Sequence, residues 1–105
     1  MPTYLFTYKG ATQPDNPEEG QQLMNRWREW VNTISDRIVI ANSPVGPAKA
    51  VSSDGITEVV ESTVTNGFTA LSAASLEEAV SIAQSCPHTE IGVIEVREMF
   101  EMPNR

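Results

Sequence analysis

The chain contains little cysteine, histidine or basic charge. Its 105 residues include one Cys and one His, and seven Lys and Arg stand against fourteen Asp and Glu, for a net charge of −7. One cysteine cannot form an internal disulfide, so nothing asks for an oxidising compartment and we expect a cytoplasmic protein. The negative charge argues against nucleic acid as a partner. We expect no metal or other cofactor, because Cys86 and His88 alone are too few ligands for zinc.

Long hydrophobic runs are also absent. No apolar stretch approaches the roughly 20 residues of a membrane helix, and the N-terminus lacks the pattern of a signal peptide, so we expect no membrane association. Hydrophobic residues make up 40% of the chain and charged residues 20%, a composition typical of folded rather than disordered proteins. At this length residues 1–105 should form one domain.

The first half of the chain predicts a strand, a helix and a second strand. Residues 3–8 alternate aromatic and smaller side chains, as strands do. A helix should begin at Pro17, because Asn16 and Glu19 have the spacing of a capping box. The short apolar run 37–41 then predicts a strand that "NSPVGP" ends. The helix has an apolar stripe at helical spacing, formed by Leu23, Trp27, Trp30 and Ile34 and widened by Met24 and Val31.

The second half predicts a hairpin, a strand, a helix and a last strand. Residues 48–60 form two β-like arms around Ser53-Asp54-Gly55, and residues 67–73 form a further strand. Ser75 begins the second helix in a capping box. Pro87 must end that helix, and the alternating run 91–100 should follow at once as a strand.

This order contains two βα units whose helices would cover the same face of an antiparallel sheet. It predicts an α+β fold, a ferredoxin-like sandwich with two helices on one face and an inserted hairpin. The first strand offers large side chains to both faces, so we expect exposed aromatic rings on the uncovered face. Those rings should drive formation of a homodimer packed sheet against sheet, with a sheltered hollow for a small organic ligand.

Several segments resemble the YCII-related (YciI-like, DGPF-type) proteins. They are "YLFTYKG", "PEEGQQLMNRWREW", "SPVGPAKAVSSDG" and, most specifically, "ASLEEAVSIAQSCP" followed by "IGVIEVREM". The resemblance runs nearly end to end and implies a dimeric ferredoxin-like α+β barrel, similar in architecture to muconolactone isomerases. Some members carry a His and an Asp in a pocket and are proposed enzymes. Here the helix His falls at Trp27 and the "DGPF" segment reads "VTNGF", so that acid/base pair cannot be carried over and enzyme status stays open.

Four residues are candidates for chemistry. Glu95 and Arg97 project to the same side of the last strand. Arg97 could receive a carboxylate or enolate oxygen while Glu95 orients it or acts as base, or the two could form a solvated charge pair worth under about 1 kcal/mol. His88 is the default general base, or else an exposed histidine in a connecting loop. Cys86 could be a nucleophile, but a small buried hydrophobe is the preferred interpretation.

Further residues are candidates for ligand binding. Trp27 and Trp30 could form the floor of a pocket for a flat molecule, although such a helix stripe is more often core. Tyr8 of the first strand is a further candidate to bind the ligand. Ser43 and Lys49 lie around two prolines in "SPVGPAK", which is either a rigid connector or a rim that closes over the pocket.

The leading hypothesis is therefore a small homodimer that binds a small organic molecule, carboxylated or aromatic, with no assigned reaction. An alternative is an isomerase or lyase-like enzyme that moves a proton next to a carbonyl, with His88 or Glu95 as base and Arg97 as anion holder. A third is an accessory protein-interaction module in transcription regulation, because YCII-like domains resemble accessory domains found beside transcription factors.

Overall fold

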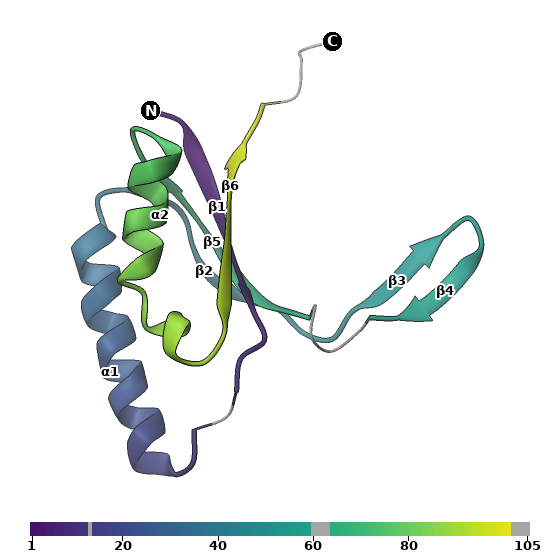
Figure 1. The fold of residues 1–105 in the computed structure, drawn as a ribbon, viewed down its shortest axis with the longest axis horizontal. Coiled ribbons are helices and arrows are strands. Elements are labelled where there is room, and N and C mark those ends of the chain that lie inside the picture. The colour runs from purple at the N-terminus through teal and green to yellow at the C-terminus, as the bar shows by residue number, and fades with distance from the viewer. Residues whose placement is uncertain (13, 60–63, 102–105) are drawn as a thin grey trace.

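The computed structural model describes residues 1–12, 14–59 and 64–101. Four strands form an antiparallel sheet in the order β2-β5-β1-β6, and β3 and β4 form a separate hairpin. Helices α1 and α2 lie on one face of the sheet (Figure 1). The elements are β1 (Thr3–Lys9), α1 (Pro17–Ile34), β2 (Ile38–Pro44), β3 (Lys49–Ser52), β4 (Gly55–Glu58), β5 (Thr65–Ser72), α2 (Leu76–Gln84), the 3-10 helix η2 (Pro87–Glu90) and β6 (Val93–Met99). This is the ferredoxin-like α+β arrangement that the sequence predicts, with the hairpin inserted between β2 and β5.

Both helices begin where the capping pattern predicts. The Asn16 side chain accepts a hydrogen bond from the backbone N–H of Glu19 at 2.9 Å, and Pro17 occupies the first turn of α1. Ser75 does the same for the N–H of Glu78 at 3.1 Å in α2. Each cap satisfies a backbone donor that the first helical turn leaves without a partner. None of the helices in the described ranges is long and apolar enough to cross a membrane.

The core lies between the sheet and the helices, and it contains the aromatic residues of β1. Tyr4, Phe6 and Tyr8 are 3%, 0% and 3% exposed. The Phe6 ring stacks on Trp30 with centroids 6.4 Å apart. The prediction of exposed aromatic rings on the uncovered sheet face is therefore wrong for β1, because its rings all point to the helices. From β1 the uncovered face receives the half-buried Leu5 instead.

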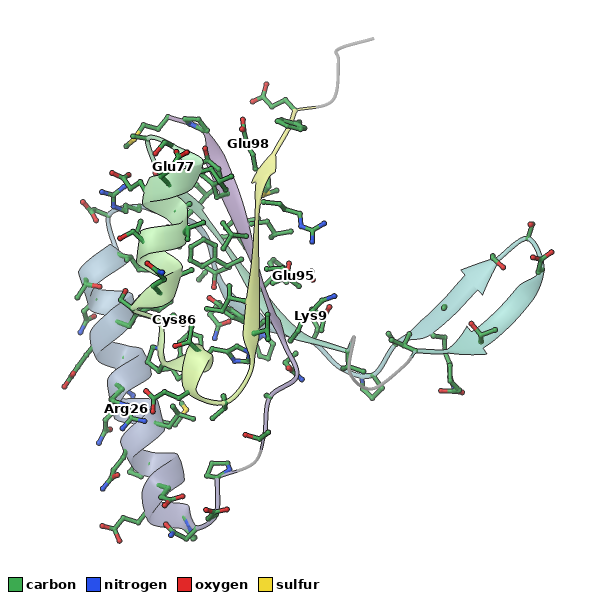
Figure 2. All side chains as sticks on the ribbon, in the orientation of Figure 1. Lys9, Arg26, Glu77, Cys86, Glu95 and Glu98 are labelled. Carbon is green, nitrogen blue, oxygen red and sulfur yellow. The ribbon has the colours of Figure 1, made fainter. Side chains whose placement is uncertain are left out.

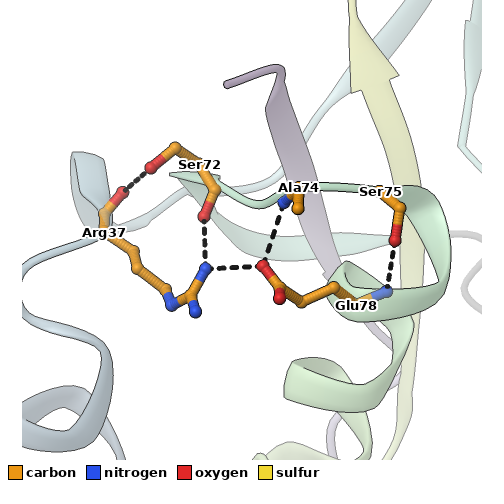
Figure 3. Close-up of polar contacts among 5 residues, drawn as sticks. All are labelled: Arg37, Ser72, Ala74, Ser75 and Glu78. Atoms are coloured by element: carbon orange, nitrogen blue, oxygen red, sulfur yellow. Dashed lines mark hydrogen bonds and ion pairs between the residues drawn. The ribbon is translucent and has the colours of Figure 1, made fainter.

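A polar network joins the start of β2 to the end of β5 and to α2 (Figure 3). Arg37 donates to the carboxylate of Glu78 at 2.7 Å and to the carbonyl of Ser72 at 3.3 Å. The backbone N–H of Ala74 donates to the same carboxylate at 2.9 Å. The hydrogen bond from Ala74, and after it the one from Arg37, lowers the pKa of Glu78. The network fixes where the second βα unit starts relative to the first helix.

Strand ends are where the structure departs from the sequence patterns. β2 continues to Pro44 rather than ending near residue 41, because Ser43 and Pro44 pair with Phe68 and Gly67 of β5. A Cβ on Gly67 would lie 2.9 Å from the Ser43 carbonyl oxygen, so this close approach needs glycine.

The hairpin forms where the sequence predicts it, but the connection between α2 and β6 differs from the prediction. β3 and β4 pair around a turn at residues 53–54, as predicted, with Gly55 at φ +130. The end of the predicted second arm, Val60, lies outside the described residues. The last strand does not follow α2 at once, because η2 intervenes between Pro87 and Glu90.

Candidate functional site

The candidate site is a cavity of about 550 Å³ between α1 and the part of the sheet where β1, β2 and β5 meet. This volume is in the range of small-molecule sites. Helix α1 supplies one wall, with residues that recur every three or four positions and so share a face. Those residues are Met24, Trp27, Arg28, Val31 and Asn32. The strands and their connections supply the rest, which comprises Tyr8, Ala11, Asn42, Pro44, Asn66, Gly67 and His88.

Two of the aromatic ligand-binding candidates, Tyr8 and Trp27, are among the residues that line the cavity. The Tyr8 and Trp27 rings meet edge to face with centroids 5.2 Å apart, which fixes both orientations. The Tyr8 hydroxyl forms a buried 2.7 Å hydrogen bond with the Thr69 hydroxyl. Burial raises the pKa of Tyr8 well above its ordinary value, so the phenol stays neutral. Trp27 is thus both packed against the core and available to a ligand.

His88 also lines the cavity, and it is buried rather than exposed in a connecting loop. Its side chain comes from η2 and is only 3% exposed. Nε2 lies 3.0 Å from the backbone carbonyl oxygen of Lys9. A carbonyl can only accept, so Nε2 carries the proton, and in the neutral ring Nδ1 is the atom with a free lone pair.

Gly92 positions His88, and sequence reasoning missed it. A Cβ at Gly92 would lie 2.3 Å from the Lys9 carbonyl oxygen and 2.7 Å from His88 Nε2. Any larger residue would therefore displace the two partners of this hydrogen bond. A glycine just before an alternating strand is the only sequence signal of this role.

Sequence reasoning also missed the polar part of the cavity wall. Of the described residues that line the cavity, Arg28 is the one with a permanent charge. Three amide side chains accompany it, from Asn32, Asn42 and Asn66. The sequence did contain a signal for Arg28. It follows Trp27 directly and lies four residues after Met24, so it shares the face of the helix on which Met24 lies. The arrangement offers a flat apolar wall, one cation and several hydrogen-bonding groups, which suits a planar molecule with a carboxylate or carbonyl group.

Glu95 and Arg97 lie together, but not at this cavity. They are opposite Thr7 and Leu5 of β1, on the uncovered face of the sheet. Arg97 donates to the Glu95 carboxylate at 2.9 Å, and Lys9 lies 3.3 Å from the same oxygen. Figure 2 shows Lys9 and Glu95 side by side on the side of the sheet away from the helices. The Arg97 side chain is 61% exposed in a single subunit, so water screens the pair.

Ser43 and Lys49 do not line the cavity either. Ser43 is opposite Phe68 in the sheet, and its hydroxyl donates to the Ala41 carbonyl at 2.9 Å. Lys49 lies at the base of the β3–β4 hairpin and forms an exposed ion pair with Glu58. Pro44, next to Ser43, does reach the cavity wall.

Cys86 has the environment of a structural cysteine. It is 1% exposed, and burial raises the pKa of its thiol to about 12, so the reactive thiolate is suppressed at neutral pH. The interpretation of Cys86 as a small buried hydrophobe fits this position. Within the described ranges, no group of three or more His, Cys, Asp or Glu side chains is placed to hold a metal ion.

Comparison with known proteins agrees with the resemblance noted in the sequence. The family model of the YCII-related domain matches residues 3–103. The chain belongs to the YCII-related family. Trp27, where the resemblance places the helix His of this family, lines the cavity wall. A comparison of the sequence with curated proteins gave no match.

A solved structure similar to this YCII-related chain is 5-chloro-2-hydroxyhydroquinone dehydrochlorinase (TftG) from Burkholderia phenoliruptrix, in complex with 2,5-dihydroxybenzoquinone. The TM-score is 0.61, the sequence identity is 15%, and the match covers 95% of each chain. At this identity the likeness shows a shared fold.

Proposed function

We propose that this YCII-related protein is a homodimer that binds a small planar organic molecule with an anionic or carbonyl group. The observation that carries the proposal is the cavity itself, in which Trp27 and Tyr8 form an apolar wall and Arg28 is a charged lining residue. The Arg28 guanidinium donates to the exposed side chain of Asn25 at 3.3 Å, so a ligand would compete only with a solvent-exposed contact. The similar dehydrochlorinase structure holds a molecule of this kind, 2,5-dihydroxybenzoquinone. We also propose that residues 1–105 form one domain and that the protein is cytoplasmic. Both points rest on the length and composition of the chain.

The predicted roles of Glu95 and Arg97 are part of the same proposal, at a second place. On the uncovered face they would become enclosed only when another subunit packs there. Glu95 and Arg97 would then line a cavity between the sheets of the two subunits. Arg28 and Arg97 are therefore two candidate anion-binding residues at different places. Substituting each one separately shows which of them binds the anion.

Calorimetric titration with benzoate and benzamide tests the proposal. The two probes share size and shape but differ in charge, so only benzoate gains from a nearby cation. We expect both to bind, and Arg28→Met to weaken benzoate at least fivefold while benzamide stays within twofold. Arg26→Met is the matched control, because Arg26 lies on the same helix and pairs with Glu90 outside the cavity.

Two outcomes would count against the assignment. Failure of benzoate, benzamide and 2,5-dihydroxybenzoquinone all to bind at millimolar concentration would contradict a planar-ligand cavity. Equal losses of benzoate affinity in Arg28→Met and Arg26→Met would show a general charge effect instead. A loss in Arg97→Met with none in Arg28→Met would move the anion site to the uncovered face.

The second candidate is an enzyme that moves a proton next to a carbonyl, and the geometry of His88 favours it. The bond from Nε2 to the Lys9 carbonyl holds the ring at the cavity with Nδ1 as a base. Among the described residues that line the cavity there is no carboxylate, so none of these residues would serve as an acid partner for His88. Proton NMR of bound 2,5-dihydroxybenzoquinone in D₂O separates the two: an unaltered probe supports binding alone, whereas exchange above the buffer rate that His88→Gln abolishes supports the enzyme.

A further inference from the structure

The β3–β4 hairpin stands off from the rest of the molecule. We call residues 49–58 the hairpin arm. It points away from the sheet on the side opposite the helices (Figure 1). The molecule is 45 Å long in its largest dimension, and its radius of gyration is 15.4 Å, against roughly 13 Å for a compact chain of this length. The arm is thus outside the core that stabilises the other elements.

One face of the arm carries an unburied apolar pair next to the Lys49–Glu58 ion pair. Val51 and Ile56 are direct cross-strand partners, so their side chains lie on the same face. They are 75% and 71% exposed in a single subunit. The other face carries smaller groups, such as Ala50 and Thr57. A two-stranded hairpin is at best marginally stable in water, and its exposed ion pair adds little.

We propose that the hairpin arm docks through its Val51 and Ile56 face onto a second copy of this chain. The inference rests on the proposed homodimer and adds the element that completes its interface. Because the arm extends on the uncovered side of the sheet, a subunit packed on that face would lie beside it. Each β-strand of the arm rises about 13 Å, and packed sheets lie about 10 Å apart, so the arm is long enough to reach past the partner sheet.

The sheet face alone is small for a stable dimer interface. Four strands of seven or eight residues form a face of roughly 20 by 23 Å, or about 450 Å². A stable interface of standard size uses about 800 Å² from each partner. The flat footprint of the sheet face is little more than half of that value, so an interface of standard size would gain from the added surface of the arm. In a two-fold dimer both arms would contribute, and each would be covered by the other subunit.

The distribution of charge favours a second copy as the occupant. The whole chain carries a net charge of −7, which would oppose self-association through most surfaces. The described part of the uncovered face and the arm together carry three bases and three acids, so they have no net charge. These residues are Lys9, Lys49, Arg97, Asp54, Glu58 and Glu95. The described part of this surface therefore brings no excess of like charge between two copies.

Sedimentation velocity over a range of protein concentrations tests the proposal. We expect the wild type to dimerise, and Val51→Asp or Ile56→Asp to raise the dimer dissociation constant at least tenfold. Thr57→Asp is the matched control, since it adds the same charge to the opposite face of the arm, and its constant should stay within threefold of the wild type. The arm lies outside the core, so near-ultraviolet circular dichroism should show the same folded body in all four proteins.

The outcomes separate the arm from the homodimer. A wild type that stays at 11.5 kDa at 100 µM would overturn both proposals. A wild-type dimer that Val51→Asp and Ile56→Asp leave unchanged, or that Thr57→Asp weakens equally, would overturn docking of this face and leave the homodimer standing. Hydrogen exchange gives a second measurement: the arm amides should be protected in the dimer and exchange rapidly after dilution to monomer, and equal rates in both states would contradict docking.

Discussion

Individual buried groups set how this protein responds to alkaline pH. Cys86 and Tyr8 both lie in the core, and burial raises the pKa of each, to about 12 for the thiol. The charged form of either group would have to lose its hydration inside the core. Their neutral state is therefore part of the stability of the fold, and Cys86 needs no reaction to explain its position.

Cys86 should make the protein less stable as pH rises above 9. The thiol of the unfolded chain ionises near its ordinary 9.0 and that of the folded chain near 12. Between these values the unfolded state holds fewer protons, so the contribution is complete below pH 9 and falls as pH rises. We expect the free energy of unfolding, measured with urea at pH 8, 9 and 10, to fall less steeply in Cys86→Ala than in the wild type.

Tyr8 provides an internal control for this measurement. It is present in both proteins, and its own loss of stability begins only above its ordinary pKa of 10.0. Burial is the largest cause of its raised pKa and Cys86 a smaller one, so between pH 8 and 10 the difference in slope between the two proteins reports mainly Cys86. Parallel slopes would mean that the thiol is accessible to water in solution.

At the scale of elements, the caps and the connections between helices and sheet decide where each helix begins. Two contacts hold the first turn of α2 (Figure 3). The Ser75 hydroxyl accepts a hydrogen bond from the backbone N–H of Glu78, and the Glu78 carboxylate accepts one from Arg37. The indole N–H of Trp30 donates to the Ser85 hydroxyl at 3.0 Å and so links α1 to the end of α2. Each helix is thereby held at its ends as well as along its apolar face.

Removing the α2 cap should destabilise the fold by a small and specific amount. Ser75→Ala leaves the N–H of Glu78 without its acceptor, and we expect a loss of about 1 kcal/mol in the free energy of unfolding. Urea denaturation at neutral pH measures it. Ser81→Ala is the control, because Ser81 is exposed in the middle of the same helix and alanine is a better helix former there. A Ser75→Ala protein as stable as Ser81→Ala would show that the cap is dispensable.

At the scale of the whole molecule, one face of the sheet is not covered by any described helix (Figure 1). It carries Leu5 and Phe68, both half-buried, around the fully buried Ala70. At its edge strand, β6, Val93 and Met99 are 61% and 40% exposed. Helices cover only the opposite face (Figure 1). This surface, extended by the hairpin arm, is the one on which we propose that the homodimer forms.

A positive charge at the centre of that face should separate the subunits without unfolding them. Leu5→Lys places an ammonium group opposite Arg97 in each copy, and burying four cations between two sheets is unfavourable. We expect at least a tenfold rise in the dimer dissociation constant by sedimentation. Gln22→Lys, at an exposed site on α1, makes the same change in net charge and should leave the constant unchanged. Equal behaviour of the two variants would contradict the sheet-to-sheet interface.

The sequence was most informative where a short stretch of residues determines its own structure. Capping boxes at Asn16 and Ser75 located both helices, Asp54-Gly55 located the hairpin turn, and alternation in the first and last strands separated the side chains of their two faces. The patterns also indicated Tyr8 and Trp27 as aromatic residues for a pocket. These features depend on contacts within a few residues, so their information is contained in local sequence.

Only the tertiary structure decided which residues meet across the chain. Whether Arg28 or Arg97 lies at the cavity depends on which side of the sheet the helices cover, and no local pattern gives that side. His88 looked like a loop residue because its partners, Lys9 and Gly92, become neighbours only when η2 packs against the end of β1. The order of elements by itself determined a ferredoxin-like fold. The long-range packing of α1 and η2 on the sheet determined where that fold leaves a cavity and which face it leaves uncovered.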